Sequence, residues 1–240
     1  MNYFRMTVAP LDLIKDYSEK CHINDPHFLG NHDNRSLLSF EPKISDIILN
    51  NRIKVPDLFS AGGMLSPRKI VSTRLKKILE NCSEKVSIQF YPISLIKGKK
   101  IIQGHWITNF VSFKDESLDF EKSTFIVNTD TPVKNKYGVY IDSVSSSERR
   151  RFKNLSEFLQ IKNEGWEKGT TVFTERPFIK ESENDPILLF DEVPILGIIV
   201  SEELKKEMEK HGLEGIEFKP LEIPDEEWYG PNGLRKQFYK

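Results

Sequence analysis

The chain has few of the residues that mark a disulfide scaffold, a metal cluster or a membrane span. Only two of its 240 residues are cysteines, Cys21 and Cys82, and their spacing fits neither a disulfide framework nor a metal site. We expect both to be reduced thiols, with one long-range disulfide as the alternative. The longest apolar stretch, 194–200, has the length of a buried strand, whereas a membrane span needs roughly 18–20 apolar residues.

The sequence also lacks the common motifs of catalysis and secretion. It contains no Gly-x-Ser-x-Gly, P-loop, His-Glu-x-x-His, kinase or dinucleotide-binding pattern. The N-terminus has no basic head followed by an apolar block, so we expect no secretory signal. The run 149–151 is basic but has no interleaved aromatic residues, which argues against nucleic-acid binding. We therefore expect a cytoplasmic globular protein that is not an enzyme and needs no cofactor, nucleic acid or membrane.

One loop does contain metal-ligating residue types. Asp25-Pro26-His27 and Gly30-Asn31-His32-Asp33 both occur as strings in binuclear metallophosphoesterases, where such side chains hold two metals that clamp a phosphate. In that family the strings follow different strands, with a Gly-Asp motif between them. Here they share one loop and the chain has no Gly-Asp pair, so the sequence predicts a turn-rich polar loop. A metal-dependent phosphoesterase using the 25–33 loop is the alternative, and His22 with His27 and His32 would make only a weak surface site.

What the sequence does contain is a pattern at 70–92 that recurs at 199–220. Each copy has two β-branched residues and a serine, then Leu-Lys and Glu at helical spacing, then Phe-x-Pro. The phenylalanine follows the serine by 18 residues in the first copy and 17 in the second. Such self-similarity indicates two copies of one supersecondary unit, with chance similarity between ordinary segments as the alternative.

The repeated residues predict the conformation of each unit. Ser72 and Ser201 are typical N-caps of helices. Each helix is then followed by a strand, which we expect a proline to end, since proline has no N–H for the ladder. We also expect the aromatic residues of the two copies, Phe90 and Phe218, to be buried in equivalent positions.

The remaining pattern predicts the fold class. Helix and strand candidates do not alternate strictly, which favours an α+β fold with a mixed or mainly antiparallel sheet and two similar helix-strand units over a doubly wound sheet. We expect one domain spanning 1–240. Within it, 2–8 reads as an edge strand, 13–17 as a short helix, and 145–151 as an exposed connection.

Charge is distributed unevenly along the chain. The segment 175–227 carries a net charge of -10, whereas 1–174 carries +6. An acidic third suits a basic partner, although a solvated surface without a partner is the alternative. We expect Pro224 and Pro231 to bracket an extended loop, with core packing of its tryptophan as the competing interpretation. The predicted partner-binding residues are Glu181, Glu183, Asp185, Asp225, Glu226, Glu227, Trp228 and Tyr229.

Three blocks of sequence resemble a known family. They are similar to the conserved blocks of bacterial polymorphic-toxin immunity proteins of the type named immunity protein eleven. The resemblance covers about residues 65–220, while 1–60 matches little. The first block is 72–80 with 89–93, the central block is 106–109 with 118–125, and the closing block is 198–205 with 212–218.

The resemblance implies a non-enzymatic bacterial protein that stays in the cytoplasm and neutralises a toxin encoded beside it. The cognate toxin would be the partner, and a basic toxin domain would suit the acidic segment 175–227. The sequence leaves the oligomeric state open. A non-enzymatic α+β module that binds another ligand or protein is the second hypothesis, and the phosphoesterase is the third.

Overall fold

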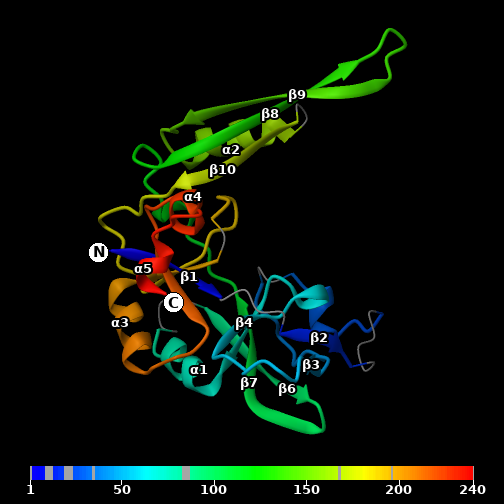
Figure 1. Ribbon diagram of the computed structural model, residues 1–240, viewed down its shortest axis with the longest axis vertical. Coiled ribbons are helices and arrows are strands. Elements are labelled where there is room, and N and C mark those ends of the chain that lie inside the picture. Colours follow the sequence, from blue (N-terminus) through cyan, green and yellow to red (C-terminus); the bar gives the residue numbers. More distant parts are fainter. Residues whose placement is uncertain are drawn as a thin grey trace.

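The computed structural model describes residues 2–8, 13–18, 24–33, 36–82, 87–166, 169–195 and 197–239. Within these residues the chain forms three sheets and five α-helices, an α+β arrangement with mixed and antiparallel sheets (Figure 1). The predicted fold class is therefore confirmed. None of the helices in the described segments is long and apolar enough to cross a membrane.

The largest sheet has six strands in the order β2–β3–β6–β7–β5–β4 and is antiparallel except between β3 and β6. The expected helix at 13–17 is wrong, because this segment is strand β2 and pairs with β3. Its four residues have no strong local preference, so the pairing decides their conformation. The strands are β2 (Ile14–Tyr17), β3 (Ile47–Leu49), β4 (Leu58–Ser60), β5 (Lys69–Ser72), β6 (Ile88–Lys97) and β7 (Lys100–Phe110), with α1 (Thr73–Glu80) after β5.

The second sheet has four strands in the order β11–β12–β1–β13. The N-terminal strand β1 lies in its interior, so the expectation of an edge strand is wrong. Both neighbours of β1 come from the far end of the chain, and no local pattern in 2–8 reveals them. The elements are β1 (Tyr3–Val8), β11 (Ile187–Leu188), β12 (Ile198–Ser201) and β13 (Ile216–Pro220), with α3 (Glu202–Lys210) after β12.

The two repeated segments form equivalent units. In the first, β7 lies between β5 and β6 and is antiparallel to both; in the second, β1 lies in the same way between β12 and β13. The registers also agree, because Trp106 of β7 is opposite Val71 and Pro92, just as Phe4 of β1 is opposite Val200 and Pro220. The central strand follows its unit in the first case and precedes it in the second. The predicted pair of helix-strand units is therefore present, with the order of unit and central strand exchanged between the two.

The details of the repeat agree only partly with prediction. The hydroxyl oxygens of Ser72 and Ser201 accept hydrogen bonds from the third residue on, at 3.3 and 3.2 Å, which confirms both N-caps. Phe218 is buried, whereas Phe90 is only half-buried. Strand β13 ends at its proline, but β6 continues through Pro92 to Lys97. This is tolerated because β3 pairs with β6 only at Leu95 and Ile96, so no neighbour on that side needs an N–H from the proline.

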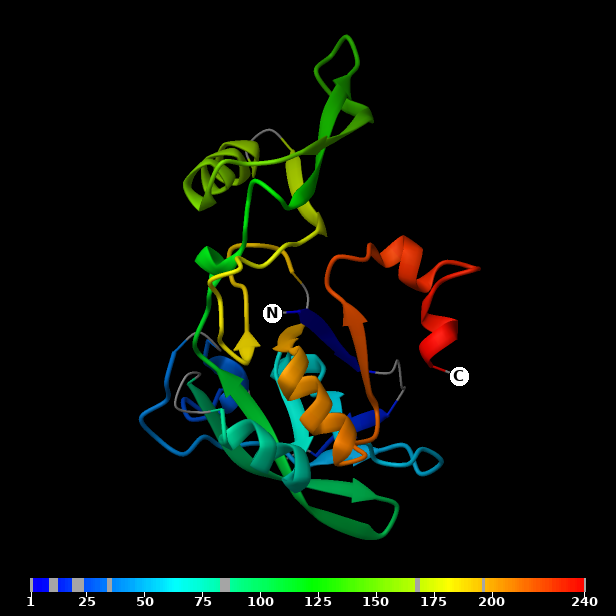
Figure 2. The same cartoon turned by 90° about the vertical axis from the view of Figure 1, so that its left-hand side faces the viewer.

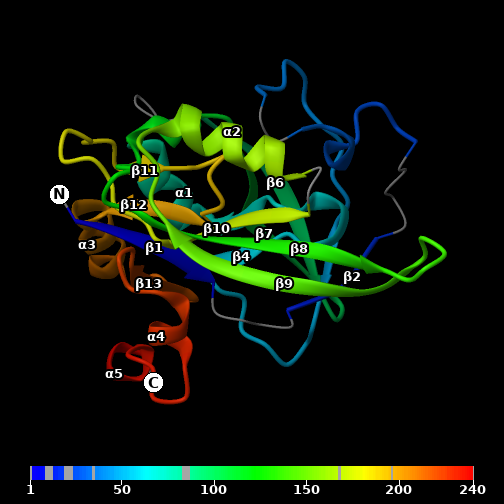
Figure 3. The same ribbon diagram turned by 90° about the horizontal axis from the view of Figure 1, so that it is seen from above.

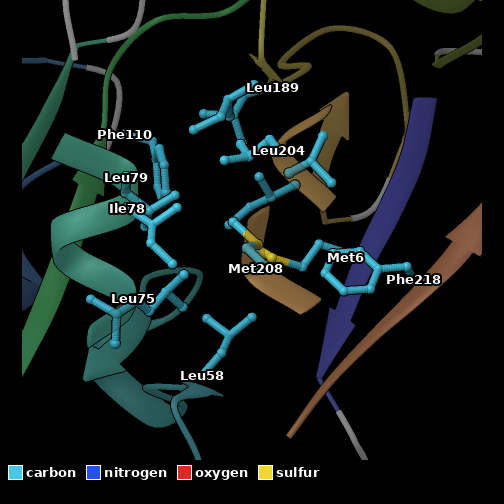
Figure 4. Packing of buried hydrophobic residues seen from close by; sticks show 14 residues of the cluster. Met6, Leu58, Leu75, Ile78, Leu79, Phe110, Leu189, Leu204, Met208 and Phe218 are labelled. Carbon is cyan, nitrogen blue, oxygen red and sulfur yellow. The ribbon is translucent and has the colours of Figure 1, made fainter. Parts of the chain in front are cut away.

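The main hydrophobic core lies between the two units. Apolar side chains of α1 and α3 meet there and pack against residues of both sheets, among them Met6 and Phe218 (Figure 4). A second cluster, which includes Phe28 and Ile47, joins the N-terminal segment to the six-stranded sheet. A third cluster, around Phe125, joins the four-stranded sheet to the last sheet and its helix. Although 1–60 has little resemblance to the immunity family, its strands are thus built into both large sheets.

The third sheet has the order β10–β8–β9 and carries a long hairpin. Its elements are β8 (Thr124–Lys134), β9 (Tyr140–Arg150), α2 (Leu155–Trp166) and β10 (Thr170–Arg176). The hairpin β8–β9 extends beyond the rest of the molecule (Figures 1 and 3). The expected connection at 145–151 is therefore mostly strand, although it is exposed as expected. The chain ends in α4 (Asp225–Tyr229) and α5 (Arg235–Phe238), which follow β13 (Figure 2).

Candidate interaction surface

The hairpin β8–β9 is longer than the strand that supports it. Strand β10 pairs with β8 only over Thr124–Thr129, so the hairpin beyond this point is two-stranded. We call residues 130–145 the arm. Isolated two-stranded hairpins are at best marginally stable in water. The arm therefore adds little to the stability of the fold, which suggests that it serves to contact a partner.

The arm exposes apolar side chains on both faces. Every residue from Tyr140 to Arg149 is exposed, although successive side chains of a strand point to opposite faces. Exposed apolar side chains gathered in one place mark interaction sites more often than chance exposure does. Those of the arm are Tyr137, Val139, Tyr140, Ile141 and Val144, with Tyr137 the most exposed at 77%.

Asn135 and Gly138 determine the turn at the tip of the arm. The side-chain oxygen of Asn135 accepts hydrogen bonds from the N–H groups of Tyr137 and Val139, at 2.9 and 3.1 Å. Gly138 adopts φ 79°, a conformation that residues with a Cβ rarely adopt. Two lysines flank the aromatic rings, with Lys134 Nζ 4.7 Å from the centroid of Tyr140 and Lys136 Nζ 4.9 Å from that of Tyr137. The tip is therefore a defined aromatic and cationic surface.

Strand β9 also leaves one edge of its sheet open. It pairs with β8 on one side, and in the portion of the chain that the structure describes no other strand pairs with it. An open edge of this length offers unpaired backbone N–H and C=O groups to another strand. Proteins usually blunt such an edge with proline, bulges or charge. The stretch Tyr140–Ser147 holds one charged residue, Asp142, and one register shift, at Ile141, beyond which the pairing with β8 is regular from Asp142 on. The arm thus combines apolar side chains with free main-chain hydrogen-bonding groups.

Much of the negative charge of the segment 175–227 is neutralised by ion pairs within the molecule. Six carboxylates of the acidic segment 175–227 form ion pairs with cations of the basic segment 1–174. These contacts join segments far apart in the chain, and they reduce the negative charge that is free to meet a partner. The pairs are Arg5–Asp225, Lys54–Glu214, Lys114–Asp185, Lys122–Glu181, Arg149–Glu175 and Lys162–Glu192.

The predicted partner-binding residues of the segment 181–185 differ in how free they are. Glu181 is exposed and contacts Lys122 at 3.0 Å. Glu183 accepts hydrogen bonds from the Ser117 hydroxyl and from two backbone N–H groups, and burial alone would oppose its ionisation. Those hydrogen bonds hold the pKa of the Glu183 carboxyl below its usual value. Asp185 is mostly covered and lies 3.1 Å from the Lys114 ammonium.

The second predicted group, 225–229, is helix α4 and not the extended loop that the flanking prolines suggested. Three acidic residues follow Pro224, and acids in the first turn favour a helix over a loop. Asp225 contacts Arg5 and Lys219, while Glu226 and Glu227 are exposed. Trp228 is 1% exposed and stacks on Phe238, as the competing interpretation expects, whereas Tyr229 is 47% exposed. The predicted residues thus lie in two places, and only some face solvent.

The loop 25–33 has its polar groups in local contacts. Asp25 forms a 2.6 Å ion pair with Lys43, and this bond, together with the N–H of His27, lowers the pKa of its carboxyl. His32 Nε2 lies 2.7 Å from the carbonyl oxygen of Pro26. Among the described residues, no group of three or more His, Cys, Asp or Glu side chains is placed to hold a metal ion. His22 and Cys21 lie outside those residues.

The arm is the functional candidate that sequence reasoning missed. A signal existed, because Tyr140-Ile141 and Val144 follow a glycine turn and lie among serines and charged residues. It indicated a strand, but a strand pattern does not tell whether its apolar residues face a core. A comparison with protein families finds no matching family model, and a comparison with curated proteins finds no match.

Proposed function

We propose that this chain is a non-enzymatic bacterial immunity protein that binds and neutralises a toxin encoded beside it in the cytoplasm. The arm carries the proposal, since an exposed apolar hairpin with an open edge is a means of binding a protein and not of performing chemistry. The resemblance to immunity proteins supports it. The first and closing blocks of that resemblance form the two equivalent units around the main core.

Strand addition is the binding mode that this geometry supports best. A strand of the toxin would extend the sheet along the open edge of β9, where main-chain hydrogen bonds supply affinity and side chains supply specificity. Tyr140, Ile141 and Val144 of β9 are all exposed, so a strand added at this edge would gain apolar contacts as well as main-chain hydrogen bonds. Exposed acids such as Glu226 would steer a basic toxin towards the complex without anchoring it.

The test is rescue of growth in bacterial cells that express the toxin domain of the neighbouring gene. Wild-type protein should restore growth, and Ile141→Asp should fail to do so, because a carboxylate on the arm disrupts an apolar contact. Ile101→Asp is the matched control. Ile101 is 66% exposed and Ile141 is 62% exposed, and Ile101 also lies in a hairpin, β6–β7, but away from the arm (Figure 1).

The expected outcome is rescue by the wild type and by Ile101→Asp, with loss of rescue and of binding for Ile141→Asp. Both variants should keep the thermal midpoint of the wild type, since surface substitutions usually change stability by less than about 0.5 kcal/mol. Equal rescue by both variants would remove the arm from the interface. Failure of the wild-type protein to bind the neighbouring toxin would refute the proposed function itself.

A further inference from the structure

A cleft separate from the arm lies where β10, β13 and α4 approach one another. Its volume is about 390 Å³. Apolar side chains line most of it, among them Ile126, Phe173, Ile195 and Leu221. Three charged lining residues, Arg5, Lys219 and Asp225, contact one another, and we call the place where they meet the charged end of the cleft. Small-molecule sites are typically concave and apolar, with a few polar groups that fix orientation, and they occupy roughly 300–1,000 Å³.

Two cations occupy the charged end of the cleft. Arg5 of β1 and Lys219 of β13 are directly opposite each other in the sheet. Lys219 is 4% exposed and the side chain of Arg5 is 13% exposed. Like charges at opposed positions of neighbouring strands are destabilising, and burial increases the cost. Burial and the nearby Arg5 together lower the pKa of the Lys219 ammonium.

One carboxylate serves both cations. Lys219 Nζ lies 2.8 Å from Oδ1 of Asp225, and Arg5 donates a hydrogen bond to the same oxygen. Arg5 Nε is buried and has no hydrogen-bond partner among the described residues. This end of the cleft therefore holds two positive charges against one negative charge.

The other charged groups of the cleft do not remove this excess. Arg149 and Glu175 neutralise each other through three hydrogen bonds of 2.7 to 3.0 Å. Glu226 is exposed at the rim, and none of its side-chain contacts within the described structure reaches either buried cation. Fixing helix α4 to the sheet needs one cation opposite Asp225, so a purely structural role leaves the second cation unexplained.

We propose that this cleft binds a small organic carboxylate with an apolar body. Its carboxylate would lie against Arg5 and Lys219, beside or in place of Asp225, and its body would lie along the apolar walls. Asp225 demonstrates that these two groups hold a carboxylate, since its oxygen already makes the contacts that a ligand would make. The site lies outside the arm, and the proposal does not depend on toxin binding.

The experiment uses 4-phenylbutyrate as the probe and its neutral amide as the matched compound, with binding measured by calorimetry. The wild type should bind the acid and not the amide. Asp225→Asn removes the competing carboxylate and should tighten binding of the acid by about tenfold or more. Lys219→Met should abolish binding. Glu226→Gln also removes an acid that lines the cleft, but one without contact to the cations, and it should leave the affinity within about twofold.

Three results would overturn the proposal. They are equal binding of acid and amide, no tightening in a folded Asp225→Asn variant, and no binding of the acid by either the wild type or Asp225→Asn. If Asp225→Asn does not fold, the decision rests on the preference of the wild type for the acid and on its loss in Arg5→Gln. Because the toxin is absent from every measurement, failure here leaves the arm proposal standing.

Discussion

Lys205 on α3 occupies in the second unit the position that Lys76 on α1 occupies in the first. Each ammonium lies over one aromatic ring from the strand that follows its helix and one from the central strand. The equivalence of the two units therefore extends from strand register to side-chain contacts. The distances to the ring centroids are 5.2 Å to Phe90 and 4.6 Å to Trp106 for Lys76, and 5.7 Å to Phe218 and 4.9 Å to Phe4 for Lys205.

The two helix caps should contribute unequally to stability despite this equivalence. Ser201→Ala removes one hydrogen bond to the Leu204 N–H and should cost about 1 kcal/mol. Ser72→Ala should cost more, since the Ser72 hydroxyl also donates to the buried carboxylate of Asp57. Urea unfolding of the two variants gives the comparison, with the exposed Ser147→Ala as control. A larger loss for Ser201→Ala than for Ser72→Ala would contradict this assignment.

Asp57 should make stability depend on pH. Its burial disfavours the charge, but hydrogen bonds from Ser72, the Glu214 N–H and Arg74 outweigh this and hold its pKa below the usual value. Because the pKa is lower in the folded than in the unfolded state, the contribution is present above pH ~4 and is lost as pH falls through the folded pKa. Asp57→Asn should therefore cost about 2 kcal/mol or more near neutral pH.

Comparing the stability loss of Asp57→Asn at two pH values tests whether the ionised carboxylate is responsible. The difference in unfolding free energy between wild type and Asp57→Asn should shrink when the measurement moves from pH ~7 to pH ~3. Glu80→Gln changes an exposed acid of the same unit and should show a much smaller difference at either pH. A gap that stays constant with pH would mean that the ionised carboxylate of Asp57 is not what stabilises the fold.

The elements of the fold that sequence predicted are those set by local chemistry. The serine caps at Ser72 and Ser201, and the helices that follow them, depend on neighbours within a few residues. The position of β1 depends on strands about two hundred residues away, so the local pattern of 2–8 could not show that β1 lies inside the sheet. Likewise, acids near 225 read as a docking loop because the cations that bind them, Arg5 among them, are distant in the chain.

The aromatic pair of α4 should divide into a core residue and a surface residue. Trp228→Ala should destabilise the protein by about 3–5 kcal/mol, because a large buried ring is lost from its stack with Phe238. Tyr229 lies one residue on but is about half exposed, and Tyr229→Ala should cost much less, about 1 kcal/mol or below. Chemical denaturation measures both.

If Tyr229 also anchors the toxin, Tyr229→Ala should weaken toxin binding by about tenfold or more while the fold stays intact. The ring would then belong to the interface together with the arm. Unchanged affinity would limit the role of α4 to packing and to its contacts with the sheet.

The exposed acids should act on the rate of toxin capture and not on the lifetime of the complex. Glu181, Glu226 and Glu227 are predicted docking acids with exposed side chains, whereas Asp225 is held by two cations. Exposed ion pairs such as those of Glu181 and Glu227 are weak, so these three acids can act on a basic toxin at a distance. The triple Gln variant should lower the association rate several-fold at low salt, and the difference should vanish near 1 M salt, where the screening length is only about 3 Å. The dissociation rate should be unchanged.

The matched control replaces the exposed Glu41, Glu116 and Glu164 by Gln, which changes the net charge equally but elsewhere on the surface. If both triple variants slow association to the same extent, net charge alone explains the effect and these acids do not define a docking surface.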